Sequence, residues 1–188
     1  MKQTMNQTGV LPASALSAAI AAGELILGAP LGERQIQPAS LDLTLGSKAW
    51  RIRASFLPGA GVNVADRLNA GLTMHELDLT GSGAVLEKGC VYLVPLREGL
   101  ALPDDISGMA NPKSSTGRID VFVRMVTDGA TAFERAPAGY HGPLYAEISP
   151  KTFSILVREG SSLNQLRLRR GLALCSDQEL RKIHEQSP

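Results

Sequence analysis

The chain has 188 residues, enough for one domain with a hydrophobic core, or one domain with small appendages. Hydrophobic residues make up 44% and charged residues 20%, which is typical of a globular domain in water. Nineteen basic residues stand against eighteen acidic ones, so no overall charge selects a nucleic acid or an anionic membrane as partner. Any anion-binding site must therefore come from a local cluster.

The cysteine count and the apolar runs exclude two further classes. Cys90 and Cys175 are the only cysteines, which argues against a disulfide framework and fits reduced thiols in a cytoplasmic protein. No apolar run reaches the about 18 residues of a transmembrane helix. The apolar residues 15–22 follow Pro12 and end at Gly23, which is typical of a short amphipathic helix and not of a signal peptide.

In chain order, residues 1–10 are expected to fray, and the first element is a helix over residues 12–22. Leu16 and Ile20 would share its buried face, and Gly23 would end it. Residues 40–46 alternate polar and apolar side chains, which predicts a strand, and residues 50–54 are a candidate continuation of it. Residues 58–71 are expected to be irregular.

The rest of the chain is predicted to be a series of short strands separated by Gly, Pro, Asp and Ser. The candidate strands cover residues 72–79, 85–86, 91–96, 119–126, 144–148, 152–157 and 164–168. Such a series favours a mainly β domain over residues 11–175, as a jelly roll, sandwich or barrel. Residues 176–188 are expected to form a C-terminal helix or linker, because Ser176 and Glu179 have capping-box spacing.

The segment 111–118 has the composition that phosphate binding needs. It places Lys113, Ser114, Ser115, Thr116 and Arg118 around one glycine. Cationic groups, hydroxyl donors and backbone amides exposed by a turn can all contact phosphate oxygens. The same residues also suit a solvated, capped turn that opens a helix, and the segment lacks the frame of a Walker A loop.

Glu147 is a lone carboxylate in the otherwise apolar strand 144–148. Leu144, Ala146 and Ile148 would share one face, and Tyr145 and Glu147 the other. The carboxylate either faces solvent or lies in a pocket, where it would be suited to proton transfer near neutral pH. Just before this strand, Tyr140 lies between two glycines, either as a platform for a sugar or base or as a half-buried residue of a hairpin turn.

Metal and serine-hydrolase chemistry receive little support from the sequence. His75, His141 and His184 are far apart, and neither a Cys-x-x-Cys nor a His-x-Glu pair is present, so the signature of the zinc-dependent nucleobase deaminases is missing. No Gly-x-Ser-x-Gly elbow occurs.

Four segments in order resemble the deoxycytidine triphosphate (dCTP) deaminase family, which shares its fold with the trimeric dUTPases. They are the helix 11–23 leading to Pro38-Ala-Ser-Leu-Asp-Leu-Thr-Leu-Gly46, the loop Lys113-Ser-Ser-Thr-Gly-Arg118, the run from Gly139 to Glu147, and Gly160-Ser-Ser-Leu-Asn-Gln-Leu166. The resemblance covers about residues 11–170 and implies a dUTPase-like distorted jelly roll or β-sandwich with a short N-terminal helix.

The resemblance also implies roles for single residues. Ser114, Arg118 and Glu147 match the family's catalytic serine, arginine and glutamate, the last as general base and then acid. The positions that match those near the triphosphate are Lys113, Ser115 and Gln165. Tyr140 matches the aromatic ring near the deoxyribose.

The implied reaction is metal-independent hydrolytic deamination of dCTP to dUTP and ammonia. Mg²⁺ would accompany the triphosphate, no zinc would be needed, and the sites would lie between the subunits of a trimer or pseudo-trimer. The expected partners are dCTP, dUTP and further copies of the domain, without nucleic acid or membrane.

Two departures from the family pattern keep alternatives open. The loop 128–138 is longer than usual and has no clear match for the water-activating Asp of dUTPases. This speaks against a dUTPase or a bifunctional deaminase–diphosphatase, unless Asp128 or Glu134 substitutes for that Asp. Residues 176–188 replace a Gly-rich closing tail and look like the junction in a longer, two-copy deaminase. The chain would then be the first half of such a protein, with a non-catalytic nucleotide-binding or assembly role as the alternative.

Overall fold

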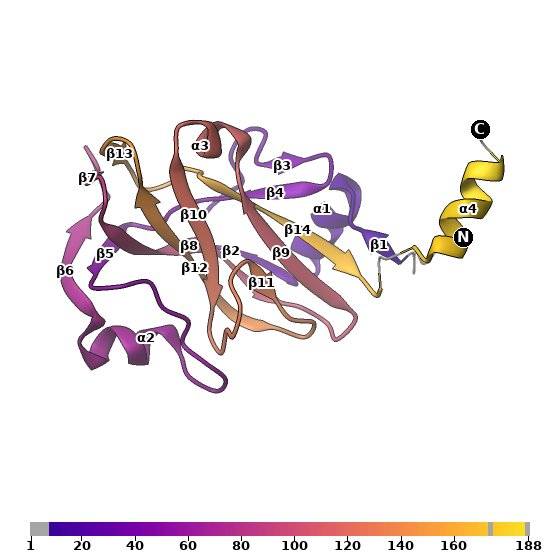
Figure 1. Cartoon of the computed structure of the whole chain (residues 1–188), viewed down its shortest axis with the longest axis horizontal. Coiled ribbons are helices and arrows are strands. Elements are labelled where there is room, and N and C mark those ends of the chain that lie inside the picture. The colour runs from indigo at the N-terminus through magenta and orange to yellow at the C-terminus, as the bar shows by residue number, and fades with distance from the viewer. Residues whose placement is uncertain (1–7, 173–174, 187–188) are drawn as a thin grey trace.

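The computed structural model describes residues 8–172 and 175–186. Most of its elements are short strands (Figure 1). In chain order they are β1 (Gly9–Val10), α1 (Ala13–Ala21), β2 (Leu25–Leu27), β3 (Ile36–Gln37), β4 (Ser40–Leu43), β5 (Lys48–Ile52), α2 (Val64–Arg67), the π-helical turn η1 (Leu68–Leu72), β6 (Thr73–Asp78), β7 (Ala84–Leu86), β8 (Val91–Ala101), β9 (Ile106–Pro112), α3 (Ser114–Arg118), β10 (Val121–Thr127), β11 (Arg135–Ala136), β12 (His141–Pro150), β13 (Ile155–Val157), β14 (Asn164–Arg170) and α4 (Asp177–Gln186).

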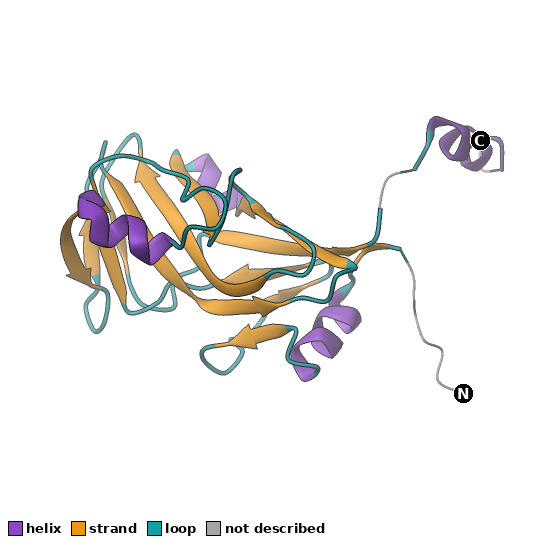
Figure 2. Cartoon of the chain, turned by 90° about the horizontal axis from the view of Figure 1, so that it is seen from below, coloured by secondary structure: helices purple, strands orange, loops and turns teal. Residues whose placement is uncertain are grey.

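Two antiparallel sheets form the body of the molecule. One has the order β11-β9-β14-β4-β3, with β1 paired to β14, and the other has the order β10-β12-β8-β5-β6, with β2 paired to β8. Strands β7 and β13 form a separate pair. Figure 2 shows the strands as stacked layers. The predicted mainly β sandwich, with one short helix near each end of the chain, is confirmed.

The main core lies between the two sheets. Strands β4 and β14 contribute leucines that are fully buried, and strands β8 and β12 contribute the apolar side chains that face them. These residues include Leu41, Leu43, Leu166 and Leu168 from the first sheet, and Val94, Leu100, Ala146 and Ile148 from the second. Burial of this apolar surface is the main driving force for closing the sandwich.

Helix α1 forms where the sequence predicts it. Pro12 is its N-cap, where a missing N–H is harmless, and alanine is the strongest helix former. Leu16 is fully buried and Ile20 packs against the core, as the spacing predicts. Gly23 ends the helix with φ 76°, a left-handed conformation that glycine adopts without steric cost.

The C-terminal helix α4 also begins as predicted. The Ser176 hydroxyl accepts the Glu179 amide at 3.3 Å, and the Glu179 carboxylate accepts the Ser176 amide at 2.8 Å, which is a reciprocal capping box. None of its residues is buried, and both views show it clear of the sheets. Residues 187–188 of the expected 176–188 segment lie outside the described residues.

Two sequence expectations about the first half are wrong. Residues 50–54 do not continue the strand 40–46, because β4 and β5 belong to different sheets. The chain crosses between the sheets at Gly46, where a Cβ would lie 2.8 Å from the Pro95 carbonyl oxygen. The expected fraying reaches less far than residue 10, because Gly9 and Val10 pair with β14, while residues 1–7 lie outside the described residues.

Further differences concern strands and helices that local pattern does not reveal. Strand β9 is rich in Gly, Ala, Asn and Pro, which have low strand propensity, yet it lies between β14 and β11. Strand β8 runs on to Ala101, past the predicted end at residue 96, and β13 begins only at Ile155. Residues 58–71, expected to be irregular, contain α2 and most of η1.

A second, smaller hydrophobic cluster covers part of the outer face of the second sheet. Residues of β5, β8, β10 and β12 meet α2, η1 and the loop before β11 there. The cluster includes Ile52, Val64, Leu68, Leu93, Val126 and Tyr145. Side chains of β12 that alternation would turn toward water are therefore buried. Among the described residues, no helix is long and apolar enough to cross a membrane.

Candidate active site

The turn that begins at Lys113 presents polar groups to solvent. Lys113 is extended, with φ −64° and ψ 147°, and α3 starts directly after it. Thr116 is buried and anchors this turn, whereas Ser114, Ser115 and Arg118 are exposed. The segment 111–118 is thus a helix-opening turn, as the simpler interpretation expected, and its polar side chains remain free to meet a ligand.

Five of the predicted site residues come together in one open pocket of about 560 Å³. Strands β4 and β14 form one wall, and α3 forms the other. Four residues carry its charges, Lys113, Arg118 and Arg167 as cations and Asp42 as the carboxylate. The excess of cations over carboxylates suits an anionic ligand. The predicted members are Lys113, Ser114, Ser115, Arg118 and Gln165.

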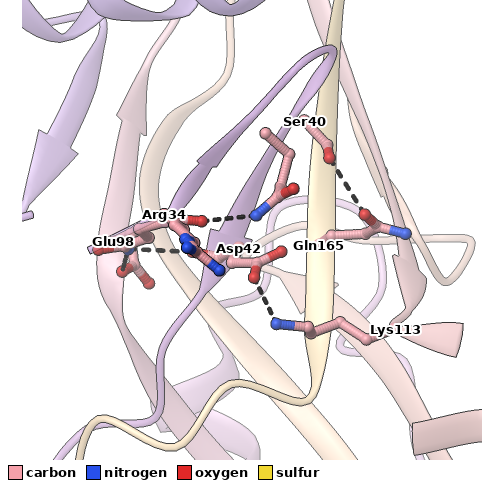
Figure 3. Close-up of polar contacts among 8 residues, drawn as sticks. Arg34, Ser40, Asp42, Glu98, Lys113 and Gln165 are labelled. Atoms are coloured by element: carbon pink, nitrogen blue, oxygen red, sulfur yellow. Dashed lines mark hydrogen bonds and ion pairs between the residues drawn. The ribbon is translucent and has the colours of Figure 1, made fainter. Parts of the chain in front are cut away.

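Hydrogen bonds orient the wall of this pocket (Figure 3). The Lys113 ammonium forms an ion pair with Asp42, and the Ser40 hydroxyl donates to the Gln165 side-chain oxygen at 3.1 Å. Lys113 and Gln165 come from segments far apart in the chain and point to the same β4 strand. Sequence reasoning missed Arg167, although it shares a face of β14 with Gln165 through the two-residue period.

A buried carboxylate, Glu98, supports β4 from behind. It is 3% exposed and accepts three hydrogen bonds. The donors are the Gln35 side-chain amide at 2.8 Å, the Thr44 hydroxyl at 2.6 Å and the Thr44 backbone amide at 2.8 Å. The Gln35 side-chain amide also donates to the Asp42 backbone carbonyl at 3.0 Å. This network fixes the backbone that presents Asp42, and it was not predicted. No local pattern marked it, because the predicted strand ended at residue 96 and Glu98 follows the charged Arg97.

Glu147 is buried, not exposed to solvent. It lies on β12, is 3% exposed, and stands opposite Arg124 on β10 and Leu93 on β8. The Arg124 guanidinium donates to its Oε1, through Nε at 3.1 Å and through Nη2. Glu147 Oε2 has no hydrogen-bond partner among the described residues, and neither has the Ser149 hydroxyl two positions on. One carboxylate oxygen is therefore held by Arg124, and the other is buried without a hydrogen-bond partner among the described residues.

Arg124, which sequence reasoning did not single out, has a defined environment. Its Nη2 donates to the Ser55 hydroxyl at 2.8 Å, and its guanidinium lies 3.8 Å from the centre of the Phe133 ring. The cation–π contact and the ion pair with Glu147 hold the guanidinium in one place. An arginine in the apolar strand 121–127 was a usable signal, but its partner depends on the register of β10 and β12.

A second carboxyl, Glu134, lies beside this group. Its Oε2 accepts the Met125 amide at 3.1 Å. Burial raises the pKa of Glu134 to about 7, against the opposing effects of the Met125 amide and the Arg124 charge. Near neutral pH this carboxyl is therefore divided between its protonated and ionised forms.

Tyr140 lies in the main hydrophobic core. It is 8% exposed, and its hydroxyl donates to the Pro143 carbonyl at 2.7 Å and accepts the Asp128 amide at 3.1 Å. Burial raises its pKa to about 12. These contacts support the hairpin-turn interpretation, and the predicted contact with a deoxyribose stays a prediction.

The predicted catalytic and substrate-binding residues do not all lie together within the chain. Ser114 and Arg118 line the cation-rich pocket, but Glu147 and Tyr140 are not among the residues that line it. Glu147 instead belongs to the second sheet, with Arg124 and the loop before β11. Among the described residues, no three His, Cys, Asp or Glu side chains gather into a metal-binding group.

Comparison with known proteins identifies the family of this architecture. The family model of the N-terminal domain of 2′-deoxycytidine 5′-triphosphate deaminase matches residues 7–172. The chain belongs to this family. A crystal structure of 2′-deoxycytidine 5′-triphosphate deaminase from Agrobacterium tumefaciens superimposes with a TM-score of 0.90 at 57% identity, over 96% of this chain and 54% of that one.

Two curated dCTP deaminase relatives are more distant in sequence. The dCTP deaminase of Haloarcula marismortui is 30% identical over 70% of this chain and 65% of its own length. The dUMP-forming dCTP deaminase of Coprothermobacter proteolyticus is 32% identical over 64% of this chain and 60% of its own length. The chain thus spans slightly less than two thirds of these relatives, and about half of the Agrobacterium tumefaciens protein.

Proposed function

We propose that this chain provides the triphosphate-binding and proton-transfer residues of a metal-independent hydrolytic dCTP deaminase. The observation that carries the proposal is the state of Glu147. Its carboxylate is buried, Arg124 holds Oε1, and Oε2 has no partner among the described residues. A fixed carboxylate with one free oxygen is suited to accept a proton from a water molecule.

The cation-rich pocket would bind the triphosphate. Lys113 and Arg118 supply positive charge, and the Ser114 and Ser115 hydroxyls supply donors on the same turn. Gln165 adds an amide from β14. The substrate would enter as its Mg²⁺ complex, since Mg²⁺ prefers phosphate oxygens, water and one or two carboxylates, and Asp42 is the carboxylate in this pocket.

The reaction at the base follows from the roles of three residues. Glu147 takes a proton from water, and the hydroxide adds to C4 of cytosine. The carboxyl returns this proton to N3 of the base. It then takes the proton of the new C4 hydroxyl and passes it to the departing amine as the C4–N bond breaks, so that dUTP and ammonia form. Ser114 and Arg118 would stabilise the charge that develops at the base. Fixing the water in place supplies much of the rate enhancement.

Assembly would bring the two residue groups together. Because Glu147 does not line the pocket that contains Ser114 and Arg118, a complete site needs a second copy of this domain. One copy would supply Glu147 and its neighbour the pocket, in a trimer or pseudo-trimer. The relatives' names include dUMP-forming enzymes, but the loop 128–138 offers no clear match for a dUTPase-type Asp.

The test is ammonia release from Mg²⁺-dCTP by the chain and by Glu147→Gln, with dCTP binding measured by calorimetry. The wild type should release ammonia, and the variant should lose activity at least about 100-fold while it still binds dCTP. The matched control is Glu33→Gln, which should retain full activity. Glu33 is an exposed glutamate in the loop between β2 and β3.

Other outcomes separate the alternatives. Pyrophosphate released together with ammonia would make the chain bifunctional. Binding of dCTP without ammonia from a folded, assembled wild type would refute the deaminase proposal and support the non-catalytic half of a longer protein.

A further inference from the structure

The loop that precedes β11 brings a second carboxyl to the ion pair of Glu147. The Glu134 amide donates to the Met125 carbonyl at 2.9 Å, and the Glu134 carboxyl accepts the Met125 amide at 3.1 Å. Met125 follows Arg124 directly on β10. The backbone of β10 therefore fixes Glu134 beside the arginine that holds Glu147.

The conformation of Glu134 shows that this placement is specified. Its φ is 67°, in the left-handed region that a residue with a Cβ enters only at a cost of about 1 kcal/mol. Besides its contacts with Met125, its carbonyl accepts the Ala110 amide at 2.9 Å. These three hydrogen bonds hold both the main chain and the carboxyl of Glu134 in position.

Besides Glu147, the side chains around Arg124 include Ser55, Phe122 and Phe133, and Lys151 lies over the same Phe122 ring. From the segment after β5 the Ser55 hydroxyl accepts its Nη2 hydrogen, and from the loop before β11 the Phe133 ring covers its guanidinium. On β8 the residue opposite Glu147 is Leu93. Among the described residues, Arg124 forms an ion pair with Glu147, and its charge also lowers the pKa of Glu134, the residue next to Phe133.

From this geometry we infer that Glu134 is a positioning residue that acts on Glu147 through Arg124. The inference rests on the proposed function, because it concerns the proton acceptor of that reaction. A protonated Glu134 leaves the guanidinium charge to Glu147 alone. An ionised Glu134 takes a share of that charge, which makes Glu147 a stronger acceptor of the water proton.

The pKa of Glu134 places this change in the working range. Burial raises that pKa to about 7, so the carboxyl ionises between about pH 6 and pH 8. Deamination should therefore gain rate with pH through this residue. Glutamine at position 134 keeps the acceptor oxygen for the Met125 amide but cannot ionise.

The kinetic test compares kcat for ammonia release by the wild type and Glu134→Gln from pH 5.5 to pH 9. The ratio of wild type to variant should be near one at pH 6 and rise to about threefold at pH 8.5, with KM for dCTP unchanged. Glu33→Gln is the control and should keep a ratio of one throughout. A wild-type to Glu134→Gln ratio that does not change with pH would overturn the inference.

A second test does not depend on turnover. The ¹³C carboxyl resonance of Glu134, assigned by its loss in Glu134→Gln, is titrated in the nucleotide-free chain. Arg124→Met should move its midpoint upward by about one pH unit, because the nearby positive charge is gone. Glu147→Gln should move it downward, because Arg124 then serves Glu134 alone.

These results are distinguishable from failure of the proposed function. If no ammonia forms but both midpoints move as expected, the coupling stands and the deaminase proposal fails. If both Arg124→Met and Glu147→Gln are folded and the Glu134 midpoint stays in place, the coupling is refuted whatever the activity. Should Arg124→Met fail to fold, the Glu147→Gln titration alone decides.

Discussion

Glu134→Gln is expected to stabilise the chain above pH 7 and to leave its stability unchanged below about pH 4. In the folded chain burial raises the Glu134 pKa to about 7, whereas the unfolded chain has the ordinary value of 4.5. Between these two values the folded state keeps a proton that the unfolded state has released. The wild type therefore loses stability as the pH rises from 4.5 through 7.

The size of the effect follows from the difference between the two pKa values. For a fully buried group the loss in the free energy of unfolding would be about 3 kcal/mol. Because Glu134 is only half-buried, we reduce this loss to about 2 kcal/mol. The variant cannot ionise, so at pH 8 it should unfold at a temperature higher by about 6 °C. At pH 4 the two melting temperatures should coincide.

Thermal unfolding followed by circular dichroism at pH 4, 6, 7 and 8 measures this difference. Glu33→Gln is the matched control, because the Glu33 side chain is 91% exposed, and its melting temperature should follow the wild type at each pH. The reasoning is refuted if Glu134→Gln shifts the melting temperature equally at pH 4 and pH 8, or lowers it at pH 8.

Three further changes test other parts of the structure. Tyr140→Phe removes the acceptor of the Asp128 amide and should lower the free energy of unfolding in urea by about 1–3 kcal/mol, with the nucleotide affinity of the folded protein retained. Lys113→Met removes a cation from the cation-rich pocket and should weaken dCTP binding about 10- to 100-fold in calorimetry, while equal affinity would argue that the triphosphate binds elsewhere. Leu166→Ala opens a cavity between the sheets and should cost about 2–5 kcal/mol in the same urea assay, whereas Leu180→Ala, on an exposed face of α4, should stay within about 0.5 kcal/mol.

Local chemistry made several features readable from the sequence. The run of short apolar segments between turn residues predicts a sandwich, jelly roll or barrel of short strands, because each strand shows the alternation of buried and exposed side chains in its own sequence. The capping box of Ser176 and Glu179 and the stop at Gly23 act over a few residues, and both are present in the structure. The polar turn from Lys113 to Arg118 was recognisable for the same reason.

The neighbours of these segments were decided by the tertiary structure. Alternation turns Glu147 and Ala146 to opposite faces of β12. Glu147 is buried only because the second hydrophobic cluster packs on its face of the sheet. Its pairing with Arg124 depends on the β10–β12 register, and Glu134 reaches the pair through a left-handed backbone conformation that its residue type does not favour. The sequence alone determined which residues have the required chemistry, whereas contacts between distant segments decided which of them share a site, because such contacts depend on strand order and loop paths that no local pattern encodes.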